Sequence, residues 1–178
     1  MKVRSNILIL TLQYILFLCI GDFFLSFKVF PSWELHAMFD SFIHGVSGVL
    51  LIAWYSVLQK SRWWLVYGYF ISAGLDVDHF IMARSIRIID ALRIPHRPIS
   101  HSILFSIIFG FFIYFVFRKK SIGCISGLII CAHVLRDSAG STLTPWLWPF
   151  YSPPIPFILY YIIQCIILVL CCICSSWE

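Results

Sequence analysis

Charged residues are scarce in this chain. Its 178 residues include eight acidic and thirteen basic side chains, so 12% of positions are charged. An ordinary soluble domain carries about 25%. Hydrophobic residues make up 61% of the sequence, and the mean hydropathy is +0.92. A chain with this composition cannot cover itself with polar surface, which argues against a soluble globular fold. We therefore expect residues 1–178 to form one integral membrane domain that has the lipid bilayer as its surroundings.

Features that mark several other protein classes are also missing. The net charge of +5 is spread over short loops and forms no basic stripe with interleaved aromatics, so nucleic acid is not expected as a partner. Most of the seven cysteines lie inside apolar runs, so no disulfide framework is expected. The basic start and first apolar run resemble a signal peptide, but no small-x-small cleavage site follows. We interpret this run as an uncleaved transmembrane helix.

The sequence contains instead a series of long apolar runs. A helix needs about 17–25 residues to cross a bilayer, and six runs approach this length. We predict an all-α integral membrane bundle of about six transmembrane helices, with spans near 6–27, 34–58, 63–83, 99–117, 121–140 and 157–174. Residues 84–98 repeat apolar side chains at helical spacing, which predicts a short interfacial amphipathic helix between the third and fourth spans.

Basic residues are distributed unevenly between the two sides of this bundle. The side that holds the amino terminus has Lys2, Arg4, Lys60, Arg62, Arg118, Lys119 and Lys120. The opposite side has Lys28, Arg84, Arg87, Arg93 and Arg97. The positive-inside rule therefore predicts a multi-pass protein with both termini in the cytoplasm.

The polar side chains that interrupt the spans fall at one end of the predicted bundle. Consecutive spans run in opposite directions, so a position late in one span lies level with a position early in the next. The set comprises Asp22, His36, Asp40, His44, Asp76, Asp78, His79, His101, His133 and Asp137. A charge inside a bilayer costs several kcal/mol unless it is paired, hydrated or bound to metal. We therefore expect these side chains to converge on one site.

Two spans present possible metal ligands at four-residue spacing, which places them on one helix face. His36, Asp40 and His44 form one such row, and His133 with Asp137 forms another. Imidazole combined with carboxylate suits zinc, non-haem iron or manganese, and the number of candidate ligands allows two metals. The alternative is a polar network that pins the helices together. Arg136 has both interpretations, either as a partner of a carboxylate or as a fork for a phosphate.

Three motifs follow one another in a recognisable order. They are Asp76-Val-Asp-His79, Pro95-His-Arg-Pro-Ile-Ser-His101-Ser102 and His133-Val-Leu-Arg-Asp137, with a Trp- and Pro-rich loop after them. This series resembles the bacterial family of inner-membrane predicted metal-dependent hydrolases that is typified by a LexA-regulated protein. Among animal proteins it resembles the transmembrane protein 267 family, from about residue 21 to about residue 160. The bacterial family is itself distantly similar to zinc phospholipase C and P1-type nucleases.

The resemblance implies a divalent-metal-dependent hydrolase, with zinc as the expected metal and a phosphoester or lipid at the membrane surface as the substrate. The implied ligands are His44, Asp76, Asp78, His101, His133 and Asp137. Asp40 is then expected to act as general base and Arg136 to steady an anion. The chain departs from the bacterial pattern after Asp137, where Thr144-Pro145 comes later, and it has no second His/Glu set. The alternative function is a non-catalytic membrane scaffold or interaction protein whose His/Asp cluster is structural.

Overall fold

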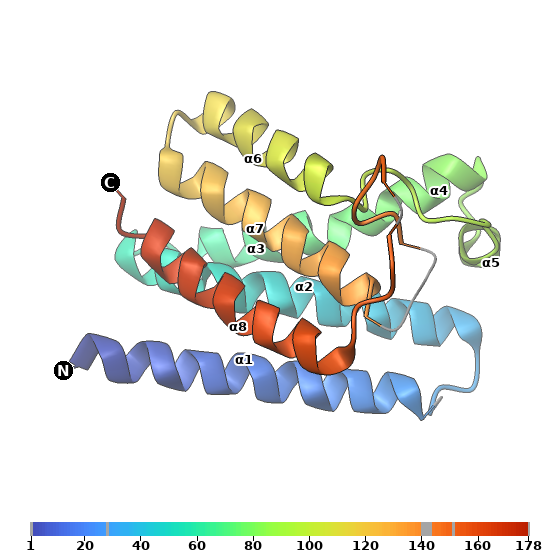
Figure 1. The fold of residues 1–178 in the computed structure, drawn as a ribbon, viewed down its shortest axis with the longest axis horizontal. Helices are drawn as coiled ribbons and strands as arrows, with labels where there is room; N and C mark the ends of the chain where they lie inside the picture. The colour runs from blue at the N-terminus through green and yellow to red at the C-terminus, as the bar shows by residue number, and fades with distance from the viewer. Residues whose placement is uncertain (1, 28, 140–143, 151, 178) are drawn as a thin grey trace.

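Helices form the regular structure of the chain over the described residues, 2–27, 29–139, 144–150 and 152–177, with one isolated bridge between Ala139 and Ile155. In this computed structural model the helices are α1 Lys2–Ser26, α2 Trp33–Leu58, α3 Trp63–Ala73, η1 Gly74–Asp76, α4 Val77–Ala83, α5 Ile88–Leu92, α6 Ile103–Phe117, α7 Lys120–Asp137 and α8 Phe157–Cys174. The expected all-α class is confirmed, and Figure 1 shows the long helices packed as a bundle.

The third predicted span is broken near its end. Helix α3 stops at Ala73, a single 3₁₀ turn follows, and α4 then runs to Ala83. The Asp76-Val-Asp-His79 motif therefore crosses a junction between two helical segments. Arg84 ends α4 in the left-handed conformation, with φ of 51°. The break gives Asp76 and Asp78 directions that a continuous α-helix does not allow.

Serine N-caps set where two helices begin. The hydroxyl of Ser32 accepts a hydrogen bond from the backbone N–H of Leu35, and that of Ser102 accepts one from Phe105. Each such cap stabilises a helix by about 1 kcal/mol. Because Ser102 caps α6, this helix begins at Ile103 rather than at residue 99. His101, which falls within the predicted span 99–117, therefore lies in the loop that precedes α6.

Length and composition support a membrane bundle without establishing six crossings. Among the described residues, three helices are long and apolar enough to cross a bilayer, namely Asn6–Ser26 within α1, α2 and α8. Helix α6 is apolar but has 15 residues. The predicted interfacial helix 84–98 contains only the five-residue α5. In Figure 1 the two ends of the chain lie at one end of the bundle, and α5 lies at the other.

Glycines allow the closest approaches between helices. An added Cβ at Gly48 of α2 would lie 2.2 Å from the carbonyl oxygen of Gly68 in α3. An added Cβ at Gly110 of α6 would lie 2.9 Å from the carbonyl oxygen of Gly123 in α7. Small residues at such crossings let backbones pack by van der Waals contact, which matters where lipid removes the hydrophobic driving force.

Helices α1, α7 and α8 are joined by a buried polar chain. The Tyr14 hydroxyl donates to the Gln164 side-chain oxygen over 2.7 Å. The Gln164 amide donates in turn to the carbonyl oxygen of Ala132 over 2.8 Å. Around this chain pack fully buried apolar side chains such as Leu18 and Leu168. The bundle therefore holds α7 rigidly along its length, and the end of α7 carries the site.

Substitution of Gly48 by alanine tests the tight α2–α3 crossing. The new Cβ would meet backbone rather than a movable side chain, so we expect overpacking to cost about 1–3 kcal/mol and to lower the melting temperature in detergent. Gly74→Ala is the control, because nothing lies within 4 Å of a Cβ built there. Equal melting temperatures for both variants would contradict this account of the crossing.

Candidate metal centre

Four potential ligand atoms from three segments of the chain meet at one end of the bundle. They are Asp76 Oδ1 at the α3–α4 junction, His101 Nε2 before α6, and His133 Nε2 and Asp137 Oδ2 on α7. His101 Nε2 and His133 Nε2 each lie 3.3 Å from Asp137 Oδ2. Asp76 Oδ1 lies 3.4 Å from His133 Nε2 and 3.8 Å from His101 Nε2. The four atoms therefore surround a common point.

Three of these four spacings fall in the range of a tetrahedral zinc site, and the 3.8 Å between Asp76 Oδ1 and His101 Nε2 lies slightly above it. Zinc bonds of roughly 2.0–2.2 Å to nitrogen and oxygen place neighbouring ligand atoms about 3.3–3.6 Å apart in a tetrahedron. The side chains of His101 and His133 are fully buried, at 0% exposure. Within the described part of the chain, neither ring nitrogen of His101 or His133 has a hydrogen-bond partner, although carboxylate oxygens are near. Buried imidazoles normally find partners, so nitrogens that face a shared point without bonding fit a bound cation.

Asp78 contacts the outer nitrogen of a ligand histidine. Its Oδ2 lies 3.3 Å from His101 Nδ1, the ring nitrogen opposite the one that faces the centre. The Ser100 hydroxyl donates to the same carboxylate oxygen. His79 Nδ1 lies 2.9 Å from Asp78 Oδ1. A carboxylate behind a ligating histidine orients the ring and raises its basicity, so the geometry places Asp78 behind His101 rather than among the four central atoms.

His44 likewise lies beside the four-atom group rather than within it. Its Nε2 is 3.0 Å from Asp137 Oδ1, the carboxylate oxygen that points away from the centre. Its ring stacks on His133, with centroids 3.7 Å apart. The same Nε2 is 2.9 Å from Arg136 Nη1. These contacts fix the positions of His133 and Asp137 from the α2 side.

Arg136 is engaged by two carboxylates. Its Nε and Nη2 donate to Asp22 Oδ1 over 3.1 and 2.9 Å, and Nη1 donates to Asp40 Oδ1 over 2.6 Å. The Tyr161 hydroxyl donates to the other Asp22 oxygen over 3.0 Å. The guanidinium therefore fills the space among Asp40, His44 and Asp137, a second group with metal-like spacing. This arrangement favours the carboxylate-pairing interpretation of Arg136 and ties α1 and α2 to α7.

The sequence left Arg97 with the same two interpretations as Arg136, with a solvated loop residue favoured, and the structure pairs it with a carboxylate. Its Nη1 donates to Asp137 Oδ2 over 2.6 Å, and its side chain is 27% exposed. Burial disfavours the guanidinium charge, but the Asp137 carboxylate raises the pKa of Arg97 above its usual value, with help from Asp40 and Asp76. Arg97 therefore stays charged beside the centre. The Pro95-to-Ser102 motif contained this residue, but no spacing rule linked it to Asp137.

The other two histidines lie apart from the cluster. His96 is exposed, and the His36 ring lies near Phe30 and Trp33, with centroids 6.1 Å from each. The four-residue row His36–Asp40–His44 is therefore divided, because His36 lies among aromatic rings whereas Asp40 and His44 both contact Arg136. Position on one helix face did not decide which side chains reach the same centre.

The loop after α7 returns to the site. The Thr144 hydroxyl donates to the backbone carbonyl of Asp137 over 2.9 Å, and the backbone N–H of Ile155 donates to the carbonyl of Ser138 over 2.9 Å. The backbone N–H of Ile103 donates to the carbonyl of Trp146 over 3.0 Å. Although Thr144 lies seven residues after Asp137, the loop brings it back to the last turn of α7, where its hydroxyl binds the Asp137 backbone.

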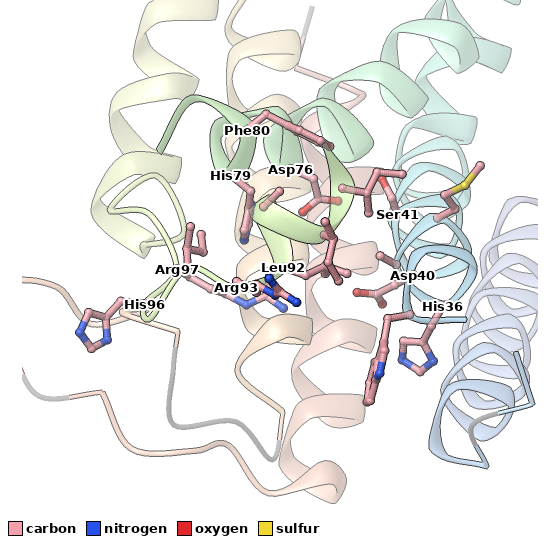
Figure 2. A pocket seen from close by; sticks show the side chains of 17 residues that line it. His36, Asp40, Ser41, Asp76, His79, Phe80, Leu92, Arg93, His96 and Arg97 are labelled. Carbon is pink, nitrogen blue, oxygen red and sulfur yellow. The ribbon is translucent and has the colours of Figure 1, made fainter. Parts of the chain in front are cut away.

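Two cavities adjoin the centre. The larger, of about 740 Å³, lies between α2, α4 and the segment around α5, and Asp76 and His79 line it (Figure 2). The smaller, of about 270 Å³, is lined by Asp22, Arg136 and Asp137 among others. Asp40 and Arg97 line both cavities. The centre can therefore be approached from two sides.

The fold and the site together define a helical membrane protein with a buried histidine–carboxylate cluster at one end of its bundle. Within this class the chain belongs to the YdjM inner membrane protein family, whose model matches residues 38–177. This match covers all four central residues and confirms the resemblance to the bacterial family.

Curated animal proteins named transmembrane protein 267 are also similar to the chain. The Bos taurus protein is 28% identical over 160 residues, which cover 83% of this chain and 73% of that protein. The Danio rerio protein is 29% identical over 158 residues, covering 81% and 69%. The Mus musculus protein is 28% identical over 159 residues, covering 83% and 73%. No solved structure matches the chain.

Replacement of Arg136 by methionine tests the ion-pair group that holds α1 and α2. The change leaves Asp22 and Asp40 without their cation, and loss of one partner from a buried ion pair costs about 3–5 kcal/mol. We expect a clearly lower melting temperature in detergent. Arg87→Gln removes an exposed arginine and serves as the control. An unchanged melting temperature for Arg136→Met would show that the pairs contribute no stability.

Proposed function

We propose that this protein is a divalent-metal-dependent hydrolase that acts on a phosphoester or lipid at the membrane surface. The observation that supports this most strongly is the convergence of two imidazole nitrogens and two carboxylate oxygens on one buried point. The ring nitrogens there have no hydrogen-bond partner among the described residues. A purely structural network would be expected to satisfy these nitrogens, whereas a metal centre requires their lone pairs to be free.

Asp76, His101, His133 and Asp137 would hold the metal, and zinc suits this donor set best. Two carboxylates balance the charge of a divalent cation, so the neutral histidines add no further charge to a buried site. Asp78 and His44, which were also expected as ligands, would act behind His101 and Asp137. A bound divalent cation supplies a Lewis acid for a phosphoryl oxygen and lowers the pKa of water to about 7.

Asp40 is the proposed general base. It is not among the four central residues, its side chain is 30% exposed, and it lines both cavities that adjoin the centre. One of its oxygens accepts a hydrogen bond from Arg136 over 2.6 Å, which holds the carboxylate in place and leaves the other oxygen to accept a proton from water. Arg136 would then act on the reaction through Asp40. Arg97, beside Asp137, is better placed than Arg136 to steady an anion that enters the larger cavity.

The charge distribution of the loops supports a multi-pass arrangement with cytoplasmic termini. In this orientation the centre lies near the non-cytoplasmic surface of the membrane. Substrate would then be drawn from that leaflet or from the compartment beyond it.

The second candidate is a membrane scaffold in which the cluster is structural. The observation in its favour is the Asp22–Arg136–Asp40 group, where a guanidinium already pairs with two carboxylates without any metal. A scaffold requires only that the helices be joined, so this function predicts neither a bound metal nor turnover.

Metal content of the purified protein separates the two candidates. We expect elemental analysis to find stoichiometric zinc, iron or manganese in the wild-type protein, and a chelator to lower its melting temperature. His133→Ala combined with Asp137→Ala removes two of the four central ligands and should abolish the metal. His96→Ala, which changes an exposed histidine, should retain it. A wild-type protein without stoichiometric metal would rule out the hydrolase.

The role of Asp40 is tested by Asp40→Asn. Loss of a general base typically lowers turnover about 10²–10⁴-fold, so we expect a loss in this range for hydrolysis of bis(p-nitrophenyl) phosphate or p-nitrophenyl phosphate. Metal content should stay at the wild-type level, because Asp40 is not one of the four central residues. Turnover that survives Asp40→Asn would show that another group accepts the proton.

A further inference from the structure

The larger cavity has walls of a kind that suits a hydrocarbon chain. Apolar side chains line it from three segments: Met38 of α2, Phe80 of α4, and Ile89, Leu92 and Ile94 in and after α5. Its volume of about 740 Å³ lies within the range of roughly 300–1,000 Å³ that is usual for small-molecule sites. A small hydrophilic substrate would leave most of this apolar surface without a partner.

The mouth of the cavity exposes apolar side chains. Among the lining residues, Trp33 is 62% exposed, Met38 is 58% exposed and Leu92 is 45% exposed. Tryptophan is typical of the boundary between headgroups and hydrocarbon. In a membrane protein, an apolar rim around an opening points to access from the bilayer rather than from water.

Two arginine side chains lie where the apolar walls of the cavity approach the candidate metal centre. Arg93 and Arg97 both line the cavity, as do Asp40 and Asp76. Arg93 is exposed and has no carboxylate partner among the described residues, whereas Arg97 is paired with Asp137. Figure 2 shows the Arg93 and Arg97 side chains extending into the space between the α5 segment and Asp40, with His96 apart from them. A free guanidinium next to an apolar chamber is suited to a phosphate group.

The smaller cavity offers water a separate route to the candidate metal centre. The smaller cavity is polar, with Ser26, Asp22, Arg136 and Asp137 in its lining. Asp40 belongs to both cavities, so the proposed base faces the polar approach on one side and the apolar chamber on the other. A reaction between a membrane lipid and water requires two such routes, whereas a soluble substrate could share one route with water.

We propose that the larger cavity binds a phosphate-bearing lipid, with its acyl chain along the apolar walls and its phosphate against Arg93 and Arg97. This lipid is the substrate class of the proposed hydrolase, so the hydrolysis step rests on the proposed function, whereas lipid binding does not. In the hydrolysis, the oxygen of water bonds to phosphorus and the bond from phosphorus to the lipid alcohol oxygen breaks. Asp40 takes a proton from the water, and this proton then passes to the departing alkoxide, which becomes the free alcohol.

Binding is tested on the full-length protein in phosphatidylcholine nanodiscs, without reliance on turnover. The probe is lysophosphatidic acid with a diazirine and an alkyne in its acyl chain, and the reference probe is the monoacylglycerol with the same chain. After irradiation, mass spectrometry measures label on cavity-lining peptides relative to label on α8. We expect at least fivefold more relative label from the phosphate probe. Unlabelled lysophosphatidic acid should compete, and inorganic phosphate at the same concentration should not.

Two variants distinguish binding of the lipid's acyl chain from binding of its phosphate headgroup. Ala37→Trp fills the chamber from α2 and should reduce labelling by both probes, whereas Arg93→Gln should reduce labelling by the phosphate probe alone. Ile108→Trp on the exposed face of α6 and Arg87→Gln outside the cavity are the matched controls. Because Arg93 is exposed, its variant should fold even if Ala37→Trp does not.

The outcomes distinguish this inference from the proposed function. Equal labelling by the two probes, indifference to Arg93→Gln, or competition by inorganic phosphate alone would overturn the lipid-phosphate site. Both variants should keep the wild-type metal content. Selective labelling in a protein without metal would support the lipid site while ruling out the hydrolase. Bound metal without selective labelling would support the hydrolase while ruling out the lipid site.

Discussion

The carboxylate of Asp137 is the contact on which the rest of the site depends. One oxygen lies 3.0 Å from His44 on α2. The other lies 3.3 Å from both His101 and His133 and accepts a 2.6 Å hydrogen bond from Arg97. A single buried side chain thus joins α2, α7 and the loop before α6. A carboxylate in this setting requires compensating charge, since an unpaired buried ion is far more costly than a paired one.

Arg136, the neighbour of Asp137 in sequence, faces a different part of the bundle. Successive residues on an α-helix point about 100° apart, so Arg136 reaches Asp22 and Asp40 while Asp137 reaches His101 and His133. His44 contacts both Arg136 and Asp137. The last turn of α7 therefore serves two groups. One is held by a guanidinium that pairs with two carboxylates, and the other has ring nitrogens without a hydrogen-bond partner among the described residues. The first group explains why α1 and α2 stay at the site, and the second makes the site a candidate for chemistry.

The position of the site at one end of the bundle determines which molecules can reach it. Charged groups at the end of a bundle can be reached both by water and by lipid headgroups, whereas the same groups at mid-depth would be sealed. The polar and apolar cavities meet at Asp40 and Arg97, between the two environments. The loop that returns through Thr144 and Trp146 ties α6 and α7 together at the same end. Contacts within the protein therefore hold this end of the bundle together.

The amino-acid sequence by itself determined the class, the residue types and the end of the bundle at which the site lies. Low charge and long apolar runs require a helical membrane bundle, and alternation of span direction places Asp22, Asp40, His44, Asp76, His133 and Asp137 at one end. Only the tertiary structure decided which of them meet. Asp40 and His44 lie on one face of α2, yet Asp40 pairs with Arg136 whereas His44 contacts both Arg136 and Asp137. The break at Gly74–Asp76 aims Asp76 at the centre and Asp78 behind His101. Arg97 reaches Asp137 through a loop path that no periodicity encodes, because ion pairs between distant segments depend on how the whole chain packs.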